Sequence, residues 1–190
     1  MRVVTLTPAL LSDACHQLAQ RVLASQCRPA LIVGIQSGGA EVARWMKPDF
    51  PDAQYVEVRL SRPSTRHKEA GLLHRLLRRL PLWLCNALRM VESRIGEWRS
   101  RGKQLPERVG QLTIEADVPS GGTILLIDDA IDTGATIHTL RQHLVQQFPG
   151  VAVRVAVITV TTARPACDAD FCLYHNRTLC RFPWSNDYRQ

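Results

Sequence analysis

The chain has 190 residues, of which 45% are hydrophobic and 22% charged, and its formal net charge is +7. This length fits one domain with a substantial core, and the composition excludes a disordered chain. No apolar stretch reaches the length of a membrane span, and the N-terminal apolar run is too short for a signal peptide. We therefore expect a cytoplasmic protein with a single domain over residues 1–190.

Strands and helices are predicted to alternate along the chain. Thr7 has the character of a helix N-cap and Pro8 that of a first helical residue, and apolar residues then recur at helical spacing up to Leu23. The predicted strands are 2–6, 30–35, 55–60, 123–127, 151–160 and 171–175. Further helices are predicted at 40–46 and after residue 136, and the chain is expected to end in turns. This order indicates βαβ units and a parallel sheet.

The segment 123–136, with the sequence TILLIDDAIDTGAT, places three acidic residues between an apolar strand and a helix. The run 123–127 has the β-branched character of a buried parallel strand, and Asp128 and Asp129 follow it. Ligands of open α/β sheets bind at the carboxyl ends of the strands. The loop that begins at Asp132 offers backbone N–H groups and hydroxyls to a phosphate. Ionised carboxylates only accept hydrogen bonds, so the pattern fits a ligand with hydroxyls, a divalent ion and a phosphate.

These residues resemble the phosphoribosyl pyrophosphate (PRPP) motif of the type I phosphoribosyltransferases, in which two acids precede an Asp-Thr-Gly-Ala-Thr loop. The resemblance implies a Rossmann-like parallel sheet flanked by helices. It implies that Asp128 and Asp129 bind the ribose hydroxyls, directly or through Mg²⁺. The residues implied for the 5-phosphate are Thr133, Gly134, Ala135 and Thr136. Asp132 would then be the general base near the acceptor, and a helix N-cap is its alternative role.

A second loop, with the sequence GIQSGG from Gly34 to Gly39, also lies between an apolar strand and a helix. Its glycines allow backbone N–H groups to approach an anion, although a glycine pair is also ordinary turn chemistry at such a place. The type I phosphoribosyltransferases carry their pyrophosphate loop after an early strand. The resemblance therefore implies a pyrophosphate site made by Gln36, Ser37, Gly38 and Gly39.

Half of the basic residues lie in one segment. Residues 59–103 hold 12 of the 24 Lys and Arg residues and three acidic residues, a formal charge of +9, so the rest of the chain carries −2. We expect a basic, largely helical insertion at 61–105 that faces an anionic partner. Its first part lies where the family has a mobile loop, and there Arg62, Arg66 and Lys68 are candidates to clamp the pyrophosphate.

The second part of this insertion, 72–99, has apolar residues at helical spacing with arginines around them, and Pro81 interrupts the pattern. We expect two helices with one of three roles: a hood packed on the sheet, a dimer contact, or a membrane-surface contact in which Trp83 and Trp98 enter the acyl boundary. Nucleic acid is not expected as a partner, because the aromatic residues lie in the apolar stripe and not among the basic residues.

The C-terminal sequence RFPWSND, at 181–187, resembles the Phe-Pro-Trp ending of purine-type members of the family. This resemblance makes Trp184 a candidate to stack on a nucleobase. Sealing an edge of the core is its alternative role.

The resemblance implies a PRPP-dependent phosphoribosyltransferase, a pentosyl-transferring glycosyltransferase that uses Mg²⁺, and we expect a homodimer. The predicted acceptor is a nucleobase of the 6-oxopurine type, as in nucleotide salvage. One alternative is transfer to a hydroxyl of a lipid-linked glycan in polysaccharide biosynthesis, at the inner face of the membrane. The other is a PRPP-sensing regulator without turnover.

Overall fold

The structure is a computed structural model that describes residues 2–59, 112–175, 178–185 and 188. The predicted insertion at 61–105 lies outside these residues, and so do its clamp candidates Arg62, Arg66 and Lys68 and the helical stretch 72–99. The division into one domain with an insertion therefore stays a prediction.

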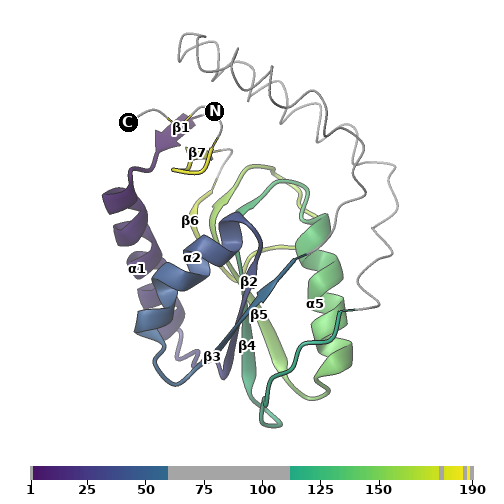
Figure 1. The fold of residues 1–190 in the computed structure, drawn as a ribbon. Coiled ribbons are helices and arrows are strands. Elements are labelled where there is room, and N and C mark those ends of the chain that lie inside the picture. Colours follow the sequence, from purple (N-terminus) through teal and green to yellow (C-terminus); the bar gives the residue numbers. More distant parts are fainter. Residues whose placement is uncertain (1, 60–111, 176–177, 186–187, 189–190) are drawn as a thin grey trace.

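A five-stranded sheet forms the centre of the protein (Figure 1), with the strand order β3-β2-β4-β5-β6. Its strands are β2 (Leu31–Ile35), β3 (Gln54–Val58), β4 (Thr123–Ile131), β5 (Ala152–Val160) and β6 (Phe171–Tyr174). All four neighbouring pairs are parallel. The two strands that lead into the predicted ligand loops, β2 and β4, are direct neighbours. Because parallel strands end at the same edge, the two loops emerge side by side.

Helices cover both faces of this sheet. Helices α1 (Pro8–Ala24) and α2 (Gly38–Met46) pack on one face, and α5 (Ala135–Gln147) packs on the other. The core is correspondingly divided in two by the pleat of the strands. In β4, for example, Leu125 and Ile127 face the α1/α2 side, whereas Ile124 and Leu126 face the α5 side. A short 3₁₀ helix, Lys47–Asp49, follows α2.

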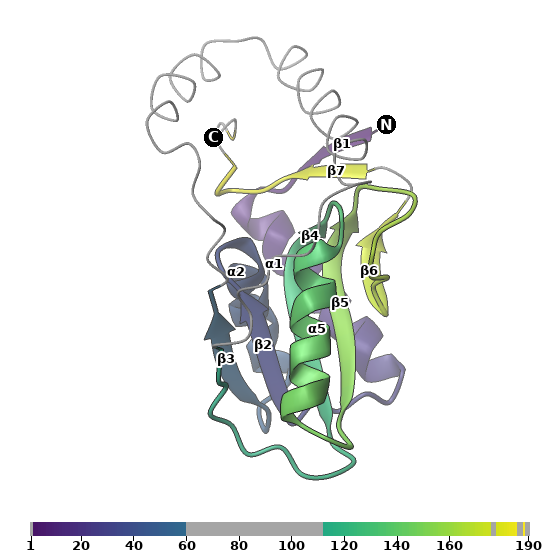
Figure 2. The ribbon, with the colours of Figure 1, turned by 90° about the vertical axis from the view of Figure 1, so that its right-hand side faces the viewer.

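A second, two-stranded parallel sheet joins the two ends of the chain. Strand β1 (Arg2–Thr5) pairs with β7 (Thr178–Arg181), and Figure 2 shows this pair across the carboxyl ends of the main strands. Arg181 is buried and donates a 2.9 Å hydrogen bond to Oγ1 of Thr5. The hydroxyl of Thr159 in β5 donates to the carbonyl of Thr178, which attaches the small sheet to the main one.

The predicted order of strands and helices and the parallel sheet are confirmed, with differences at element ends. Strand β4 continues four residues beyond the predicted end at 127, because β5 extends beside it and pairs Ala130 with Thr159. Helix α2 begins at Gly38 and not at residue 40. The turns predicted after 175 are wrong for β7, which forms because β1 offers it a pairing edge. Within the part of the chain that is described, no helix is long and apolar enough to cross a membrane.

Candidate active site

The loop after β2 lies directly against the acidic end of β4. A Cβ atom on Gly39 would lie 2.6 Å from the carbonyl oxygen of Ile127 and 2.7 Å from Cα of Asp128. A Cβ atom on Gly38 would overlap Oδ2 of Asp129. A side chain at Gly39 would clash with the backbone of β4, and one at Gly38 would require the carboxylate of Asp129 to move. Because glycine has no side chain, the backbone at the start of α2 contacts the residues Asp128 and Asp129. The predicted pyrophosphate loop is therefore adjacent to the predicted ribose site.

Helix α2 begins at this contact, with Gly38 and Gly39 as its first two residues. Its N-cap residue, Ser37, makes no side-chain capping bond, and the peptide bond between Gln36 and Ser37 is cis. Backbone N–H groups in the first turn of a helix lack intrahelical partners and favour an anion. The predicted pyrophosphate residues thus occupy a helix N-terminus at the carboxyl edge of the sheet.

Asp129 is half-buried and hydrogen-bonded to the C-terminal segment. Its Oδ2 accepts a 3.0 Å hydrogen bond from Nε1 of Trp184. Its backbone N–H donates a 2.9 Å hydrogen bond to Oδ1 of Asp128. Burial raises the pKa of Asp129, and the hydrogen bonds from Trp184 and with Asp128 oppose that rise.

Asp132, the predicted general base, lies just after β4 and is exposed. Its Oδ1 accepts a 2.7 Å hydrogen bond from the hydroxyl of Thr161, which directly follows β5. The helix N-cap at α5 is Gly134, so the alternative role of Asp132 as an N-cap is wrong. The carboxylate of Asp132 is thus held from the neighbouring strand at the rim of the site.

The predicted phosphate loop, Thr133 to Thr136, turns the chain from β4 into α5. Gly134 has a φ of 76°, in the left-handed region that glycine adopts without strain. Its Cα also faces a close neighbour, because a Cβ there would lie 2.9 Å from the backbone nitrogen of Cys167. Oγ1 of Thr133 accepts a 3.3 Å hydrogen bond from the N–H of Ala135. The loop therefore begins a helix with its N–H groups at the same sheet edge as the carboxylates.

The sequence did not predict a polar network in which Glu57 of β3 binds the side chain of Gln36. Nε2 of Gln36 donates a 3.1 Å hydrogen bond to Oε2 of Glu57. The other carboxylate oxygen of Glu57 accepts from Nε of Arg44 at 2.8 Å and from the hydroxyl of Tyr55 at 2.8 Å. Arg44 also forms an ion pair with Glu41 at 2.6 Å. The alternation of polar residues in β3 was a possible signal, because Tyr55 and Glu57 share one face of the strand.

The bonds from Arg44, Tyr55 and Gln36 lower the pKa of Glu57 to about 2. Burial and the bond to Glu57 raise the pKa of Tyr55 to about 12. Glu57 is therefore ionised and the phenol of Tyr55 neutral throughout the neutral pH range.

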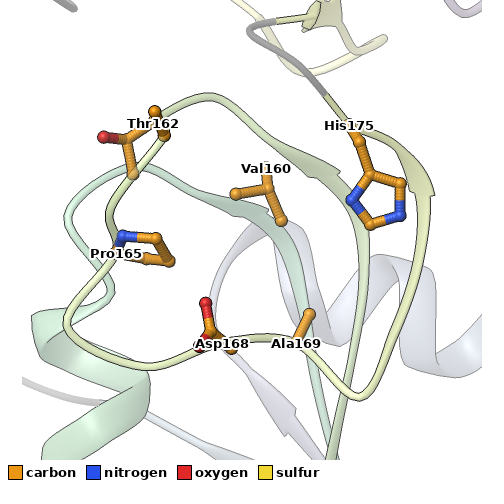
Figure 3. Close-up of a pocket in the computed structure, with 7 residues that line it drawn as sticks. Val160, Thr162, Pro165, Asp168, Ala169 and His175 are labelled. Atoms are coloured by element: carbon orange, nitrogen blue, oxygen red, sulfur yellow. The ribbon is translucent and has the colours of Figure 1, made fainter.

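A cavity of about 580 Å³ lies at the carboxyl end of β5, lined by the connection between β5 and β6 and by His175, which follows β6. Figure 3 shows Thr162 and Pro165 on one side, His175 on the other, and Asp168 along its edge. Its lining residues are Val160, Thr162, Ala163, Pro165, Asp168, Ala169 and His175. Its lining residues Val160 and Thr162 flank Thr161 in the sequence, and the hydroxyl of Thr161 is the one that binds Asp132. Its size is within the range of small-molecule sites.

The donor set at the end of β4 fits Mg²⁺. This ion prefers oxygen ligands and is usually held in proteins by one or two carboxylates together with substrate oxygens and water. Asp128 and Asp129 supply two adjacent carboxylates at a ligand-facing sheet edge. No group of three or more His, Cys, Asp and Glu side chains capable of holding a metal occurs among the residues with described positions. A metal here would therefore take its remaining oxygen ligands from substrate or water.

The structure brings together nearly all of the predicted site residues that it describes. Gln36, Gly38, Gly39, Asp128 and Asp129 meet at one edge, with Asp132 and the phosphate loop beside them. Trp184 also lies at this edge of the sheet. The sequence predicted that its ring stacks on a nucleobase, but in the structure the ring is packed within the protein. Its ring is stacked on Phe182, with centroids 5.0 Å apart and planes at 5°. Its N–H group contacts Asp129.

The fold is that of the type I phosphoribosyltransferases. A purine phosphoribosyltransferase from Pyrococcus horikoshii Ot3 superposes with a TM-score of 0.63 and 17% identity, covering 97% of this chain and 95% of that chain. A xanthine-guanine-hypoxanthine phosphoribosyltransferase from Helicobacter pylori gives 0.58 and 12%, covering 96% and 93%. A hypothetical protein from Neisseria gonorrhoeae with bound ppGpp gives 0.58 and 15%, covering 96% and 89%. No protein-family model matches the chain, and no curated protein sequence is significantly similar to it.

Proposed function

We propose that the protein transfers the 5-phosphoribosyl group of PRPP to a nucleobase of the 6-oxopurine type and releases pyrophosphate. The observation that carries this proposal is the contact between the two ligand loops. Gly38 and Gly39 lie against Asp128 and Asp129, so one ligand that carries a pyrophosphate next to a ribose can touch both loops. PRPP has this arrangement, with its pyrophosphate on C1 of the ribose and its phosphate on C5.

In this proposal the donor lies along the carboxyl edge of the sheet. The N-terminus of α2 faces the pyrophosphate, the carboxylates of Asp128 and Asp129 face the ribose hydroxyls, and the loop from Thr133 to Thr136 binds the 5-phosphate. Asp128 and Asp129 would also hold Mg²⁺. When bound, this ion would supply positive charge to the pyrophosphate oxygens.

The reaction forms a bond from a ring nitrogen of the base to C1 of the ribose and breaks the bond from C1 to the pyrophosphate oxygen. The pyrophosphate leaves with the electron pair of the broken bond. Positive charge grows on the ribose ring in the transition state, and fixed carboxylates nearby stabilise it. Asp132 accepts the proton that the base loses as it attacks, and Thr161 orients its carboxylate for this step.

The cavity at the carboxyl end of β5 is the proposed place of the acceptor. It offers the carboxylate of Asp168, the hydroxyl of Thr162 and the imidazole of His175. A 6-oxopurine has both N–H donors and a carbonyl acceptor on its ring edge, so these groups suit it. The proposal therefore assigns selection of the acceptor to the loops after β5 and β6, separately from donor binding.

The deciding experiment is an assay of pyrophosphate release with PRPP, Mg²⁺ and a panel of bases: adenine, hypoxanthine, guanine, xanthine, orotate and uracil. We expect turnover with a 6-oxopurine. Asp168→Asn and His175→Ala should raise the KM of that base and leave the KM of PRPP unchanged. Flotation with anionic liposomes accompanies the assay. Inactivity with every base, together with salt-sensitive liposome binding lost on replacing Arg75, Arg78 and Arg79, would favour the lipid-linked glycan acceptor.

A nucleotide-binding regulator without turnover is the second candidate. The bound ppGpp of the N. gonorrhoeae neighbour supports it, because that ligand also carries pyrophosphate groups on a ribose. The two functions differ at Asp132, since a regulator has no need of a general base. PRPP binding without pyrophosphate release from any acceptor, unchanged by Asp132→Ala, would favour the regulator.

A further inference from the structure

Trp184 joins three parts of the protein that are distant in sequence. Its Nε1–H donates a 3.0 Å hydrogen bond to Oδ2 of Asp129 at the end of β4. Its Nε1 would lie 2.9 Å from a Cβ on Gly38, so the bond lies against the start of α2. Its ring stacks on Phe182, which directly follows β7. The hydrogen bond therefore lies where the pyrophosphate loop, the acidic strand end and the C-terminal segment meet.

The position of the indole is fixed by packing. Phe182 is 4% exposed and belongs to the core cluster that α1 and α2 form with the sheet, and Trp184 packs against the same cluster. An indole has a single N–H donor and no acceptor, so a fixed ring defines one hydrogen-bond direction. A hydrogen bond to an ionised carboxylate is stronger than one between neutral groups. The hydrogen bond from the ring thus fixes the position of Oδ2 of Asp129. Because the carboxylate is planar and rigid, the position of the other oxygen is fixed as well.

We propose that Trp184 is a positioning residue for donor binding, acting through its hydrogen bond to Asp129. This inference rests on the proposed function, because it assigns Asp129 to the PRPP ribose. It differs from the stacking role in one chemical respect. Stacking on a nucleobase needs an aromatic face, which phenylalanine also provides, whereas positioning of Asp129 needs the N–H group, which phenylalanine lacks.

The same contact makes donor affinity depend on the C-terminal segment. Trp184 lies three residues beyond the end of β7, and the N–H of Phe182 is bonded to Oγ of Ser185 in the turn that carries the tryptophan. A change that withdraws the indole N–H from Asp129 therefore also releases the carboxylate, whereas a change that leaves the N–H in place does not. The C-terminal turn is in this sense part of the donor site, although none of its residues was assigned to PRPP from the sequence.

The test compares Trp184→Phe with Phe182→Leu, using titration calorimetry of PRPP with Mg²⁺ and without any acceptor. Trp184→Phe keeps a ring and removes the N–H, and Phe182→Leu disturbs the stacking and keeps the N–H. We expect Trp184→Phe to weaken PRPP binding by about tenfold, the size of effect typical for a hydrogen bond to a charged group. Phe182→Leu should lower the melting temperature with a much smaller loss of affinity. In steady-state assays, Trp184→Phe should raise the KM of PRPP and leave the KM of the base unchanged.

A direct readout of the bond does not depend on the folding of Trp184→Phe. In the ¹⁵N spectrum of the wild-type protein, the Trp184 indole N–H should exchange slowly with solvent, remain protected when PRPP and Mg²⁺ are added, and exchange faster in Asp129→Ala. Equal PRPP affinity of wild type and Trp184→Phe overturns the inference, as does an indole signal that Asp129→Ala does not change. Either result leaves the proposed function intact if wild type binds PRPP. Failure of wild type to bind PRPP overturns both.

Discussion

The hydroxyl of Thr161 donates a 2.7 Å hydrogen bond to Oδ1 of Asp132. Thr161 is 4% exposed, whereas Asp132 lies at the surface of the site. The same hydroxyl lies 3.2 Å from the carbonyl of Ile131, so it is held at the junction of β4 and β5. A buried hydroxyl just after β5 thus orients an exposed carboxylate just after β4. For a general base, this arrangement fixes the direction of the lone pair while leaving it accessible to the acceptor.

The first prediction concerns Asp132 as the general base. Replacing it by Asn removes the proton acceptor and keeps the shape, so kcat with the accepted base should fall by about 10²–10⁴-fold. PRPP affinity measured by calorimetry should stay within error of wild type, because the donor contacts are elsewhere. Thr161→Val is the matched variant: it keeps the volume and removes the hydroxyl, and should lower kcat by about tenfold. Unchanged kcat in Asp132→Asn would remove this residue from the mechanism.

The second prediction concerns the two acids at the end of β4. The combined replacement Asp128→Asn and Asp129→Asn removes both negative charges without changing side-chain size. We expect PRPP binding that requires Mg²⁺ in wild type and is abolished in the double variant, as measured by calorimetry with and without the metal. Far-ultraviolet circular dichroism should remain unchanged as the control for folding. Equal PRPP affinity in the double variant and wild type would contradict the assignment of the donor site.

The third prediction tests the contact between the loops. Gly38→Ala adds a methyl group that overlaps Oδ2 of Asp129, so it should displace either the start of α2 or the carboxylate. PRPP affinity should fall by at least about tenfold. Gly121→Ala is the control, because a Cβ there meets nothing within 4 Å, although its φ of 78° makes that change mildly destabilising too. If both variants bind PRPP equally well, the glycine contact is not part of the donor site.

The fourth prediction concerns Glu57, which holds Gln36 of the pyrophosphate loop. Glu57→Gln keeps the shape but removes the charge that binds Arg44, so Gln36 loses a fixed partner. We expect the KM of PRPP to rise several-fold, with a smaller change in kcat. Glu41→Gln serves as the control, because Glu41 forms an ion pair with the same arginine but is not bonded to Gln36. Steady-state kinetics showing the same KM for both variants would contradict a role in loop positioning.

The pH dependence of the Glu57 network follows from the sign of its pKa shift. The folded pKa of about 2 lies below the ordinary value near 4.3 for a free glutamate. A lowered pKa means that the stabilising contribution is fully present above the ordinary value and is lost as the pH falls toward 2. The difference in unfolding free energy between wild type and Glu57→Gln should therefore be constant from pH 5 to 9. It should shrink below about pH 4, in urea titrations at each pH.

Local signals in the sequence predicted those elements whose causes are local. Thr7 and Pro8 predict the start of α1, and the side chain of Thr7 accepts a hydrogen bond from the N–H of Leu10. The carboxyl end of β4 was predicted too early, because its last residues are strand only through pairing with β5. Strand β7 was missed for the same reason. Its partner, β1, lies at the other end of the chain, and nothing near Thr178 in sequence indicates it.

The same distinction applies to the candidate site. The acids and glycines form short motifs that a reader of the sequence can find, because a phosphate site uses neighbouring residues of one loop. Glu57 and Thr161 belong to no motif. Glu57 is 21 residues from Gln36, and Thr161 is 29 residues from Asp132, so each contact exists only once neighbouring strands have paired. Contacts of this kind, between residues of neighbouring strands, can be recognised only when the fold is known.

The pairing of β1 with β7 has a consequence for the order in which the protein is completed. Among the described elements β1 comes first and its partner β7 last, so this pairing forms only after all five strands of the main sheet have emerged from the ribosome. Trp184 follows β7 and reaches Asp129 only then. Shortening the chain at either end removes the same two-stranded sheet. The main sheet can therefore form before the hydrogen bond from Trp184 to Asp129 completes the proposed donor site.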